Sequence, residues 1–505
     1  MSELCQLQGR LADAMEAKGL WPADSPWVRH AMEGAPRHVF APDRVWDWDG
    51  DAYAPVDQAR EPARWARLVY GGVYDSTITQ VTDGLPTSSL SCEAVVADML
   101  DSLILEPGHT TLKLGTATGR NAALLATRTG RGRVTSIEFD PRLAAAAHTN
   151  LAAAGADVEV VVGDGALGAP GASQFDGVMA TYAVDVVPWA WVEQTRPGGR
   201  IVTPWGRLGQ VALTVASDGC SATGWMQGLA TFMPARGTDQ GKVWEQVRGD
   251  QPPDADGLFG QNLKTLYHDA NVLFALRVLL PDVRIRTEAG QDITAWAHDG
   301  NSSWTRIVAP QTGQATAYQG GPRHLAAELE EAWKAWDTNG APGLYEFGMT
   351  RTPQEQYIWS NDPETGPPWS TDAPVLRSPS NTLPHSEAAP APHPALLVPA
   401  GMAPSDRRSP CPGSGAPPAR GDCPTNARGV SLVNNCSPRL WDGPPSRAKA
   451  TPTKRLLPAC AGMVLPIPWG RWLPLLPTTQ GWSLGGSRRR PQTCPALPPR
   501  VRPNQ

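Results

Sequence analysis

The chain has 505 residues, of which 41% are hydrophobic and 18% are charged, and its net charge at neutral pH is −5. This composition is typical of a soluble globular protein, and the length suffices for two or three domains. The residues after 370 carry 16 Lys or Arg against 5 Asp or Glu, which leaves −16 on the part before them. An acidic body argues against nucleic acid as the main partner, because proteins bind phosphates through Lys and Arg.

The sequence has no recognisable targeting or metal-binding pattern. Its first residues do not form a basic stretch followed by an apolar one, and no run of about 18 apolar residues occurs. We therefore expect a cytoplasmic protein without a membrane partner. Five of the eight cysteines lie after residue 370 at irregular spacing. This spacing matches neither a zinc site nor a disulfide framework, so we expect no bound metal.

The first region, residues 1–90, combines helical patches with loops that contain Pro and Trp. Residues 2–18 have the pattern of a helix. A further helix is expected over 91–105, because apolar residues recur there at helical spacing and the pattern ends before Pro107. We expect the 1–90 region to contribute to a substrate site.

A regular alternation of strands and helices begins at residue 111. Strands are expected over 111–114, 134–138, 158–162, 176–180 and 200–203. The helices expected between them include 119–128 and 141–154. Such repetition predicts an α/β fold over 91–216, with a mostly parallel sheet and helices on both faces.

The pattern then changes. Residues 210–216 and 222–229 are typical of an antiparallel pair, and helices are expected over 263–280 and 322–336. These elements predict a smaller α+β C-terminal domain over 217–365.

Two further features concern the C-terminal half. Trp296 and Trp304 lie at even spacing, which predicts that they share a strand face as core residues do. The frequent prolines that follow predict a Pro- and Arg-rich disordered tail over 366–505.

The most informative segment is 111–126, in which a short apolar strand leads through small residues into a helix. Small residues at Gly115, Ala117 and Gly119 would let the backbone approach a ligand, and the start of the helix directs free N–H groups at it. The next strand ends at Glu138, 23 residues after Gly115. This is close to the interval at which a carboxylate binds ribose hydroxyls, so the segment predicts a nucleotide-cofactor loop.

A second acid follows the next strand. Asp164 lies between two glycines, where a carboxylate can accept a hydrogen bond from an adenine amino group. Asp164 and Glu138 thus end consecutive strands, where ligands of open α/β sheets bind. The alternative, that each acid only caps a helix, stays open for either acid taken alone.

These motifs resemble the protein-L-isoaspartate O-methyltransferases, a family of class I S-adenosyl-L-methionine enzymes. The family's Leu-Glu-Ile-Gly-Thr-Gly-Ser-Gly motif corresponds to residues 112–119, and its Gly-Asp-Gly is intact at 163–165. Its Pro-Arg-His-x-Phe, Phe-Asp and Pro-Gly-Gly-Arg segments match 36–40, 175–176 and 197–200. The resemblance implies a Rossmann-like class I methyltransferase fold with S-adenosyl-L-methionine as cofactor. The cofactor-binding residues that it implies are Gly115, Thr116, Ala117, Gly119, Glu138, Asp164 and Gly165.

The family also has a serine that contacts the substrate carboxylate, 24 residues before the first glycine of the loop. In this chain the spacing selects Ser91, with Ser89 beside it, as the catalytic residues. The segment 76–80 looks superficially closer to the family motif, but the spacing favours Ser91 over Thr79. The alternative is that Ser88 and Ser91 cap the following helix.

The chain departs from the family pattern in three places. Lys113 replaces an acid, Ala117 replaces the middle glycine, and Cys92 with Glu93 replaces Gln-Pro after the serine. A cation beside a cationic cofactor is unfavourable unless it points away or meets an acid, and the alanine is harmful if its φ angle is positive. A non-catalytic binding protein with a decayed cofactor loop is therefore an alternative.

The C-terminal region carries a second resemblance. Segments 296–304, 319–324 and 347–353 are similar to the extension of methyltransferases that accompany ATP-grasp ligases in ribosomal peptide maturation. This implies a peptide or protein substrate bearing Asp or isoAsp, an ATP-grasp ligase system as partner, and succinimide formation after methylation. General repair of isoaspartyl damage is the alternative. A Rossmann dehydrogenase is a weaker option, because the loop lacks the full Gly-x-Gly-x-x-Gly.

Overall fold

The structure is a computed structural model that describes residues 3–172, 174–206, 208–250 and 252–369. The tail expected over 366–505 lies outside the described residues, except for its first four.

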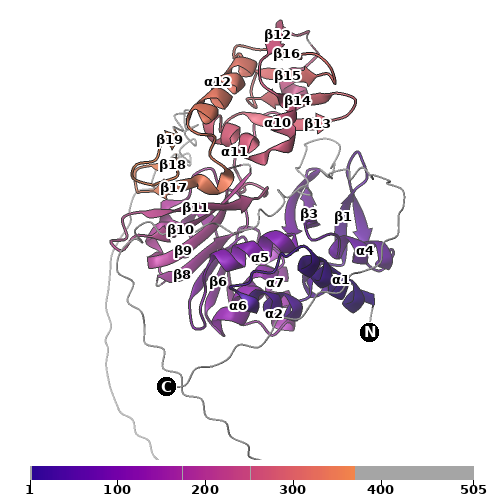
Figure 1. The fold of residues 1–505 in the computed structure, drawn as a ribbon. Helices are drawn as coiled ribbons and strands as arrows, with labels where there is room; N and C mark the ends of the chain where they lie inside the picture. The colour runs from indigo at the N-terminus through magenta and orange to yellow at the C-terminus, as the bar shows by residue number, and fades with distance from the viewer. Residues whose placement is uncertain (1–2, 173, 207, 251, 370–505) are drawn as a thin grey trace, which may run out of the picture. The chain divides into compact units, whose positions relative to one another are not determined.

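The N-terminal region combines helices with a small antiparallel sheet (Figure 1). The helices are α1 (Glu3–Ala17), α2 (Pro26–Gly34), α3 (Arg37–Phe40) and α4 (Pro62–Val69). The sheet has the order β2-β1-β3-β4, with β1 (Arg44–Trp48), β2 (Tyr53–Asp57), β3 (Thr77–Thr82) and β4 (Leu85–Leu90). The helix expected over 2–18 is confirmed, whereas the sequence pattern did not indicate these four strands.

A ten-stranded sheet of order β19-β18-β17-β11-β10-β9-β8-β5-β6-β7 follows. Its parallel strands are β5 (Thr111–Leu114), β6 (Val134–Glu138), β7 (Val158–Val162), β8 (Phe175–Ala180) and β9 (Thr195–Trp205). Its antiparallel strands are β10 (Gly209–Val215), β11 (Ala222–Leu229), β17 (Phe347–Arg351), β18 (Gln356–Ser360) and β19 (Pro368–Trp369). All five expected parallel strands and the expected antiparallel pair are confirmed.

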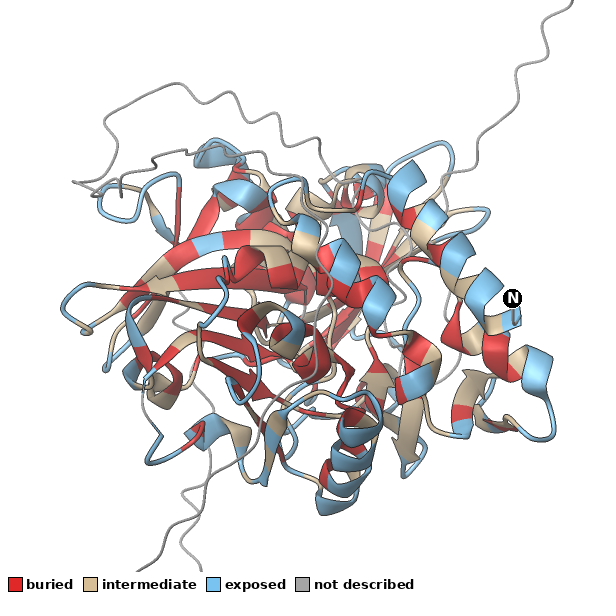
Figure 2. Ribbon diagram, turned by 90° about the horizontal axis from the view of Figure 1, so that it is seen from below, coloured by how far each residue is buried: buried red, intermediate tan, exposed pale blue. Residues whose placement is uncertain are grey.

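Helices cover both faces of this sheet, and the side chains of its strands alternate between the two cores that result. Along β8, Val178 and Ala180 point into one core and Met179 into the other. The core of Met179 includes residues of α1, α2, α4, α5 (Glu93–Ser102) and α6 (Arg120–Thr129). The opposite core includes residues of α8 (Trp189–Glu193) and of the C-terminal helices. Figure 2 shows buried residues concentrated along the strands and on the inner sides of the helices.

The C-terminal region adds a five-stranded antiparallel sheet of order β12-β16-β15-β14-β13. Its strands are β12 (Ala255–Phe259), β13 (Arg284–Ala289), β14 (Ile293–His298), β15 (Trp304–Ala309) and β16 (Ala315–Gly320). The helices of the region are α9 (Trp244–Arg248), α10 (Leu263–His268), α11 (Ala270–Leu279) and α12 (Leu325–Thr338). The single helix expected over 263–280 is thus divided at Asp269, whose carboxylate caps α11 by accepting from Asn271 N.

The prediction that Trp296 and Trp304 lie on the same strand was wrong. Trp296 lies in β14 and Trp304 in β15, so they do not share a strand. A turn separates the strands because the Asp299 carboxylate accepts hydrogen bonds from the backbone N–H groups of residues 301–303. The cross-strand register places both side chains on one face of the sheet, where Trp304 is buried and Trp296 is partly exposed.

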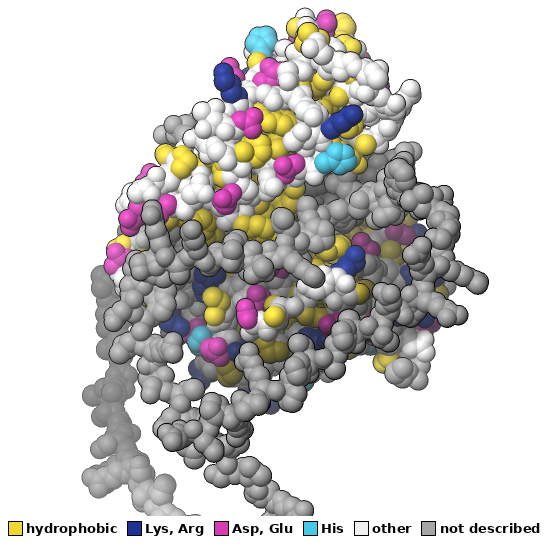
Figure 3. Space-filling model, in the orientation of Figure 1, with side chains coloured by type: hydrophobic (Ala, Val, Ile, Leu, Met, Phe, Trp, Pro, Cys, Tyr) yellow, Lys and Arg dark blue, Asp and Glu magenta, His cyan; other side chains and the backbone are white. Residues whose placement is uncertain are grey.

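The domain boundary expected at residue 216 falls between β10 and β11, which are neighbours in one sheet. Within the described residues, no helix is long and apolar enough to cross a membrane. On the visible part of the face in Figure 3, Lys and Arg side chains are scattered among acidic and apolar ones.

We expect Gly224→Ala to lower the free energy of unfolding by about 1–3 kcal/mol, because a Cβ atom on Gly224 would overlap the carbonyl oxygen of Ala212. The matched control is Gly257→Ala in β12, where a Cβ atom meets nothing within 4 Å. Urea unfolding of the two variants measures the difference, and equal stabilities would contradict this account of the β10–β11 pairing.

Candidate active site

The loop between β5 and α6 has a strained backbone. Gly115, Ala117 and Gly119 have positive φ angles of 76°, 50° and 90°. Glycine adopts such angles freely, whereas the Cβ atom of alanine makes them unfavourable. Gly119 is also required by packing, since a Cβ atom there would lie 3.1 Å from Leu151 Cγ of α7 (Pro141–Ala153). Because the φ angle of Ala117 is positive, this residue meets the condition under which we expected an alanine to be unfavourable.

A buried carboxylate joins this loop to β6. Glu138 is 5% exposed, and its Oε2 accepts a hydrogen bond from Ala117 N at 2.8 Å. Its Oε1 accepts from Asp140 N at 3.1 Å. Asp140, not Glu138, caps α7, so the alternative that Glu138 only caps a helix is wrong. Each carboxylate oxygen has two lone pairs, which leaves capacity for the hydroxyls of a ligand.

Thr116 makes a different contact. Its hydroxyl is 2.7 Å from the hydroxyl of Ser136 in β6, and both side chains are buried. This bond fixes the loop onto the sheet and occupies the Thr116 hydroxyl within the protein.

Lys113 lies beneath the loop and is fully buried. Its Nζ donates to Leu114 O at 2.9 Å, to Gly115 O at 2.7 Å and to Thr181 Oγ1 at 2.6 Å. Three acceptors match the three N–H bonds of an ammonium group. Burial nevertheless lowers the pKa of Lys113 to about 7, an effect that the charge of Glu138 opposes. These contacts with carbonyl and hydroxyl oxygens hold the loop against the start of the segment after β8.

Asp164 and its flanking glycines form the next edge of the site. The exposed Asp164 accepts a hydrogen bond from Ala166 N at 2.9 Å and so caps a short 3₁₀ turn, Gly165–Leu167. Asp164 thus caps this turn with one carboxylate oxygen, and its second oxygen keeps the capacity to accept a hydrogen bond from a ligand.

Tyr182 connects the two glycine motifs, and sequence reasoning missed it. It lies two residues after β8, against Gly115 and Gly165. A Cβ atom on Gly115 would be 3.0 Å from the tyrosine ring, and one on Gly165 would overlap its hydroxyl. Burial, with Asp164 and Glu138 nearby, raises the pKa of Tyr182, so its hydroxyl stays protonated. The only available signal was an aromatic residue after the fourth parallel strand.

The two candidate serines lie at the C-terminal end of β4, the second strand of the β3–β4 hairpin. Ser89 is partly buried in β4 opposite Ile78, and Ser91 follows the strand. The N-cap of α5 is Cys92, without a side-chain cap bond, and Ser88 instead accepts from Thr79 Oγ1 at 2.9 Å. The capping alternative for Ser88 and Ser91 is therefore wrong.

Arg236, which the sequence did not indicate, ties this hairpin to the end of β6. Its guanidinium donates to Asp140 Oδ2 at 3.3 Å and to Gln80 Oε1 at 3.0 Å. Gln80 Nε2 also donates to Asp140, at 3.2 Å. The segment of Arg236 is held nearby because Ala235 N donates to Ala183 O in the loop after β8. Gln80 of the hairpin and Arg236, which are remote in the sequence, thus both contact Asp140, two residues after Glu138.

The site offers acceptors of the kind that a nucleotide-like cofactor requires. Glycines let the loops after β5 and β7 pack closely against Tyr182, where a Cβ atom would intrude, and two carboxylates retain acceptor capacity. In the part of the chain that the structure describes, no group of His, Cys, Asp and Glu side chains could hold a metal ion.

Comparison with known proteins indicates one family. The family model described as protein-L-isoaspartate(D-aspartate) O-methyltransferase matches residues 66–237. The protein-L-isoaspartate O-methyltransferase of Pyrococcus horikoshii is 32% identical over 206 residues, which are 40% of this chain and 80% of that protein. Protein-L-isoaspartate O-methyltransferase 1 of Archaeoglobus fulgidus is 31% identical over 215 residues, which are 42% of this chain and 85% of that protein.

Solved structures of similar proteins were also found. One protein-L-isoaspartate O-methyltransferase is 18% identical, and the match covers 70% of this chain and all of that chain with a TM-score of 0.41. A Plasmodium falciparum structure of the same description, in complex with S-adenosyl-L-homocysteine, is 13% identical, covers 45% and 98% of the two chains and has a TM-score of 0.35. The family match, with the sheet order above, confirms the expected class I methyltransferase fold.

Replacing Ala117 with Gly should raise the free energy of unfolding by about 0.5–1 kcal/mol, because the strain of a Cβ atom at positive φ is removed. Ala126→Gly in α6 is the control and should lower stability by about 0.5–1 kcal/mol, since glycine is unfavourable within a helix. Urea unfolding measures both changes. An Ala117→Gly variant less stable than the parent would show that the loop is not strained.

Lys113 should make stability depend on pH. Its pKa is about 7 in the folded protein, against an ordinary value of 10.5. Between these values the unfolded chain binds one more proton at this site, so the free energy of unfolding should rise with pH by up to about 1.4 kcal/mol per unit. This contribution is absent from Lys113→Met. Urea unfolding at several pH values tests the difference, and parallel curves would mean that folded Lys113 keeps its charge.

Proposed function

The chain belongs to the protein-L-isoaspartate O-methyltransferase family, whose members are S-adenosyl-L-methionine-dependent carboxyl methyltransferases, and we propose that it methylates an aspartyl or isoaspartyl carboxylate of a peptide. The observation that carries this proposal is the hydrogen bond between Ala117 N and the buried Glu138 carboxylate. It brings the small-residue loop and the acid that ends β6 into one site.

The chain's residues would divide the binding of the cofactor among them. Glu138 accepts from the ribose hydroxyls and Asp164 from the adenine amino group. Gly115, Gly119 and Gly165 would set the shape of the two loops, because a Cβ atom at each would meet Tyr182 or Leu151. When bound, S-adenosyl-L-methionine supplies an electrophilic methyl group on a sulfonium. No residue needs to act as an acid or base, because a carboxylate is already ionised at neutral pH and is itself the nucleophile.

Ser91 and Ser89 would orient this carboxylate. Hydroxyl groups donate hydrogen bonds without a full positive charge, so they hold the nucleophile without neutralising it. The buried guanidinium beside Ser91 already has protein partners. Arg37 directs its N–H groups to the carbonyl oxygens of Val69 and Ser91 and to Thr77 Oγ1.

The contacts of the loop argue against the alternative of a non-catalytic binding protein with a decayed cofactor loop. Lys113 has three acceptors beneath the loop, and Ala117 still donates to Glu138 despite its strained angle. The departures from the family pattern are therefore accommodated by local bonds, which supports an active enzyme.

For the substrate we propose a ribosomally made precursor peptide, in a system with an ATP-grasp ligase. The five-stranded sheet and its helices lie after residue 237, where the family match ends, and this additional structure supports a dedicated substrate. After methylation, the following backbone nitrogen attacks the ester carbonyl and loses its proton, and methanol leaves as a succinimide forms. General repair of isoaspartyl proteins is the alternative, which the names of the relatives support equally.

We expect Glu138→Ala and Asp164→Ala to weaken S-adenosyl-L-methionine binding by about 10- to 100-fold each, because each removes a charged acceptor. Ser91→Ala should lower kcat and leave cofactor affinity unchanged, with the exposed Ser76→Ala as the control. Calorimetry and a labelled-methyl assay separate these effects. Unchanged cofactor affinity in both acid variants would refute the site.

The substrate class is tested by incubation with labelled cofactor and two kinds of peptide. A precursor peptide encoded beside an ATP-grasp ligase should accept methyl groups with a higher kcat/KM than unrelated isoaspartyl peptides. Equal turnover of unrelated isoaspartyl peptides would support repair instead. Cofactor binding without transfer to any carboxylate would contradict both.

A further inference from the structure

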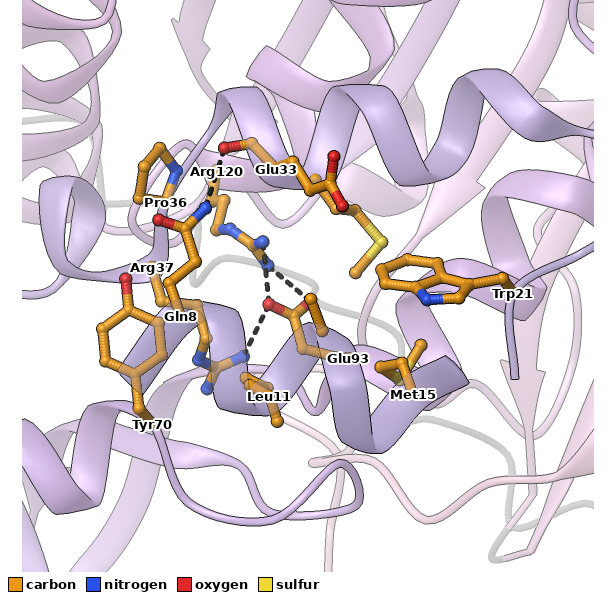
Figure 4. A pocket seen from close by; sticks show the side chains of 12 residues that line it. Gln8, Leu11, Met15, Trp21, Glu33, Pro36, Arg37, Tyr70, Glu93 and Arg120 are labelled. Atoms are coloured by element: carbon orange, nitrogen blue, oxygen red, sulfur yellow. Dashed lines mark hydrogen bonds and ion pairs between the residues drawn. The ribbon is translucent and has the colours of Figure 1, made fainter. Parts of the chain in front are cut away.

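Three charged side chains lie together in the core beside the candidate site. Arg37, Glu93 and Arg120 are 2%, 7% and 3% exposed. Arg120 donates two hydrogen bonds of 2.9 Å to the two oxygens of Glu93, and Arg37 Nη1 lies 4.0 Å from Glu93 Oε1. In Figure 4 both guanidinium groups converge on the Glu93 carboxylate. We refer to these three residues as the buried triad.

One end of the buried triad is attached to the cofactor loop. Arg120 is the first residue of α6 and directly follows Gly119, which has a positive φ angle. Its Nε donates to Ala35 O at 2.9 Å, just after α2. Arg120 therefore fixes the start of the cofactor helix through all three of its donor nitrogens.

The other end is attached to the candidate substrate segment. Arg37 donates to Ser91 O at 2.6 Å and to Leu90 O at 3.3 Å. Glu93 is itself two residues after Ser91, in the first turn of α5. Contacts thus run from Gly119 through Arg120, Glu93 and Arg37 to the backbone of Ser91.

Stability alone is a poor explanation for this arrangement. Two cations and one anion are removed from water, and apolar residues of similar volume often stabilise a core at least as well as a buried ion pair. Bidentate bonds between a planar guanidinium and a carboxylate, however, fix distance and orientation closely. The geometry of the buried triad is suited to holding two segments in register.

We propose that Glu93 is a positioning residue for methyl transfer, which sets the place of Ser91 relative to the cofactor loop through Arg120 and Arg37. The inference rests on the proposed function, because it needs Ser91 to orient the substrate carboxylate. A small displacement of Ser91 would misalign the nucleophile without removing any group that binds the cofactor.

The test separates positioning from stability. The double variant Glu93→Leu/Arg120→Met replaces the ion pair by apolar side chains, and Glu93→Asp keeps the charge but withdraws the carboxylate. Glu33→Gln is the matched control, since Glu33 pairs with Arg29 on the surface of α2. For each full-length protein we would measure the thermal midpoint, the Kd of S-adenosyl-L-homocysteine and kcat with the peptide that the parent methylates.

We expect kcat to fall by about 100-fold in the double variant and by about tenfold in Glu93→Asp, and the Kd to stay nearly unchanged in Glu93→Asp, which keeps Arg120. The double variant should have a thermal midpoint near that of the parent, and Glu33→Gln should behave as the parent. If the buried triad only stabilised the fold, a variant with the thermal midpoint of the parent would also have the kcat of the parent. If the double variant does not fold, Glu93→Asp decides.

The outcomes distinguish the two proposals. A parent that methylates peptide while both Glu93 variants keep kcat within about threefold overturns the positioning role alone. A parent that binds the cofactor but methylates no carboxylate overturns the proposed function, and the positioning role with it.

Discussion

The candidate site depends on the buried carboxylate of Glu138. By accepting from Ala117 N and Asp140 N, it joins the loop after β5 to the first residues after β6. An unpaired buried carboxylate is costly, so these N–H groups and the acid constrain one another. The strained angle of Ala117 fits this constraint, because turning that peptide would remove a partner of Glu138. Asp140 extends the same network to Arg236 and Gln80.

Sequence periodicity predicted the parallel strands and the cofactor loop, because both depend on local patterns of apolar and small residues. The β3–β4 hairpin was missed although Asp83 and Gly84 have the positive φ angles of a tight hairpin turn and form a known turn pair. The buried triad could not be predicted, since Glu93 lies 27 residues from Arg120 and Arg37 lies 54 residues from its partner Ser91. Charges this far apart along the chain give no periodic signal.

The C-terminal strands contribute to the site as well as to the sheet. Arg351 Nε donates to Val187 O at 2.7 Å, and Gln356 accepts from Val187 N and donates to Asp185 O. All three hydrogen bonds support the loop after β8, which begins beside the Gly115 loop and carries Tyr182. A substitution in β17 or β18 therefore acts on the same loop as one next to the cofactor glycines.

The position of β11 limits how this protein can be divided. A chain cut after residue 216 would leave β10 as an open edge and uncover Val211 and Leu213, whose core includes Phe274 of α11. Exposed apolar edge strands pair with other chains and promote aggregation. β11 lies within the part of the chain that the family model matches, so a chain that ends before it would lack a strand of the methyltransferase sheet itself, and we expect such a truncation to aggregate rather than to yield a usable catalytic fragment.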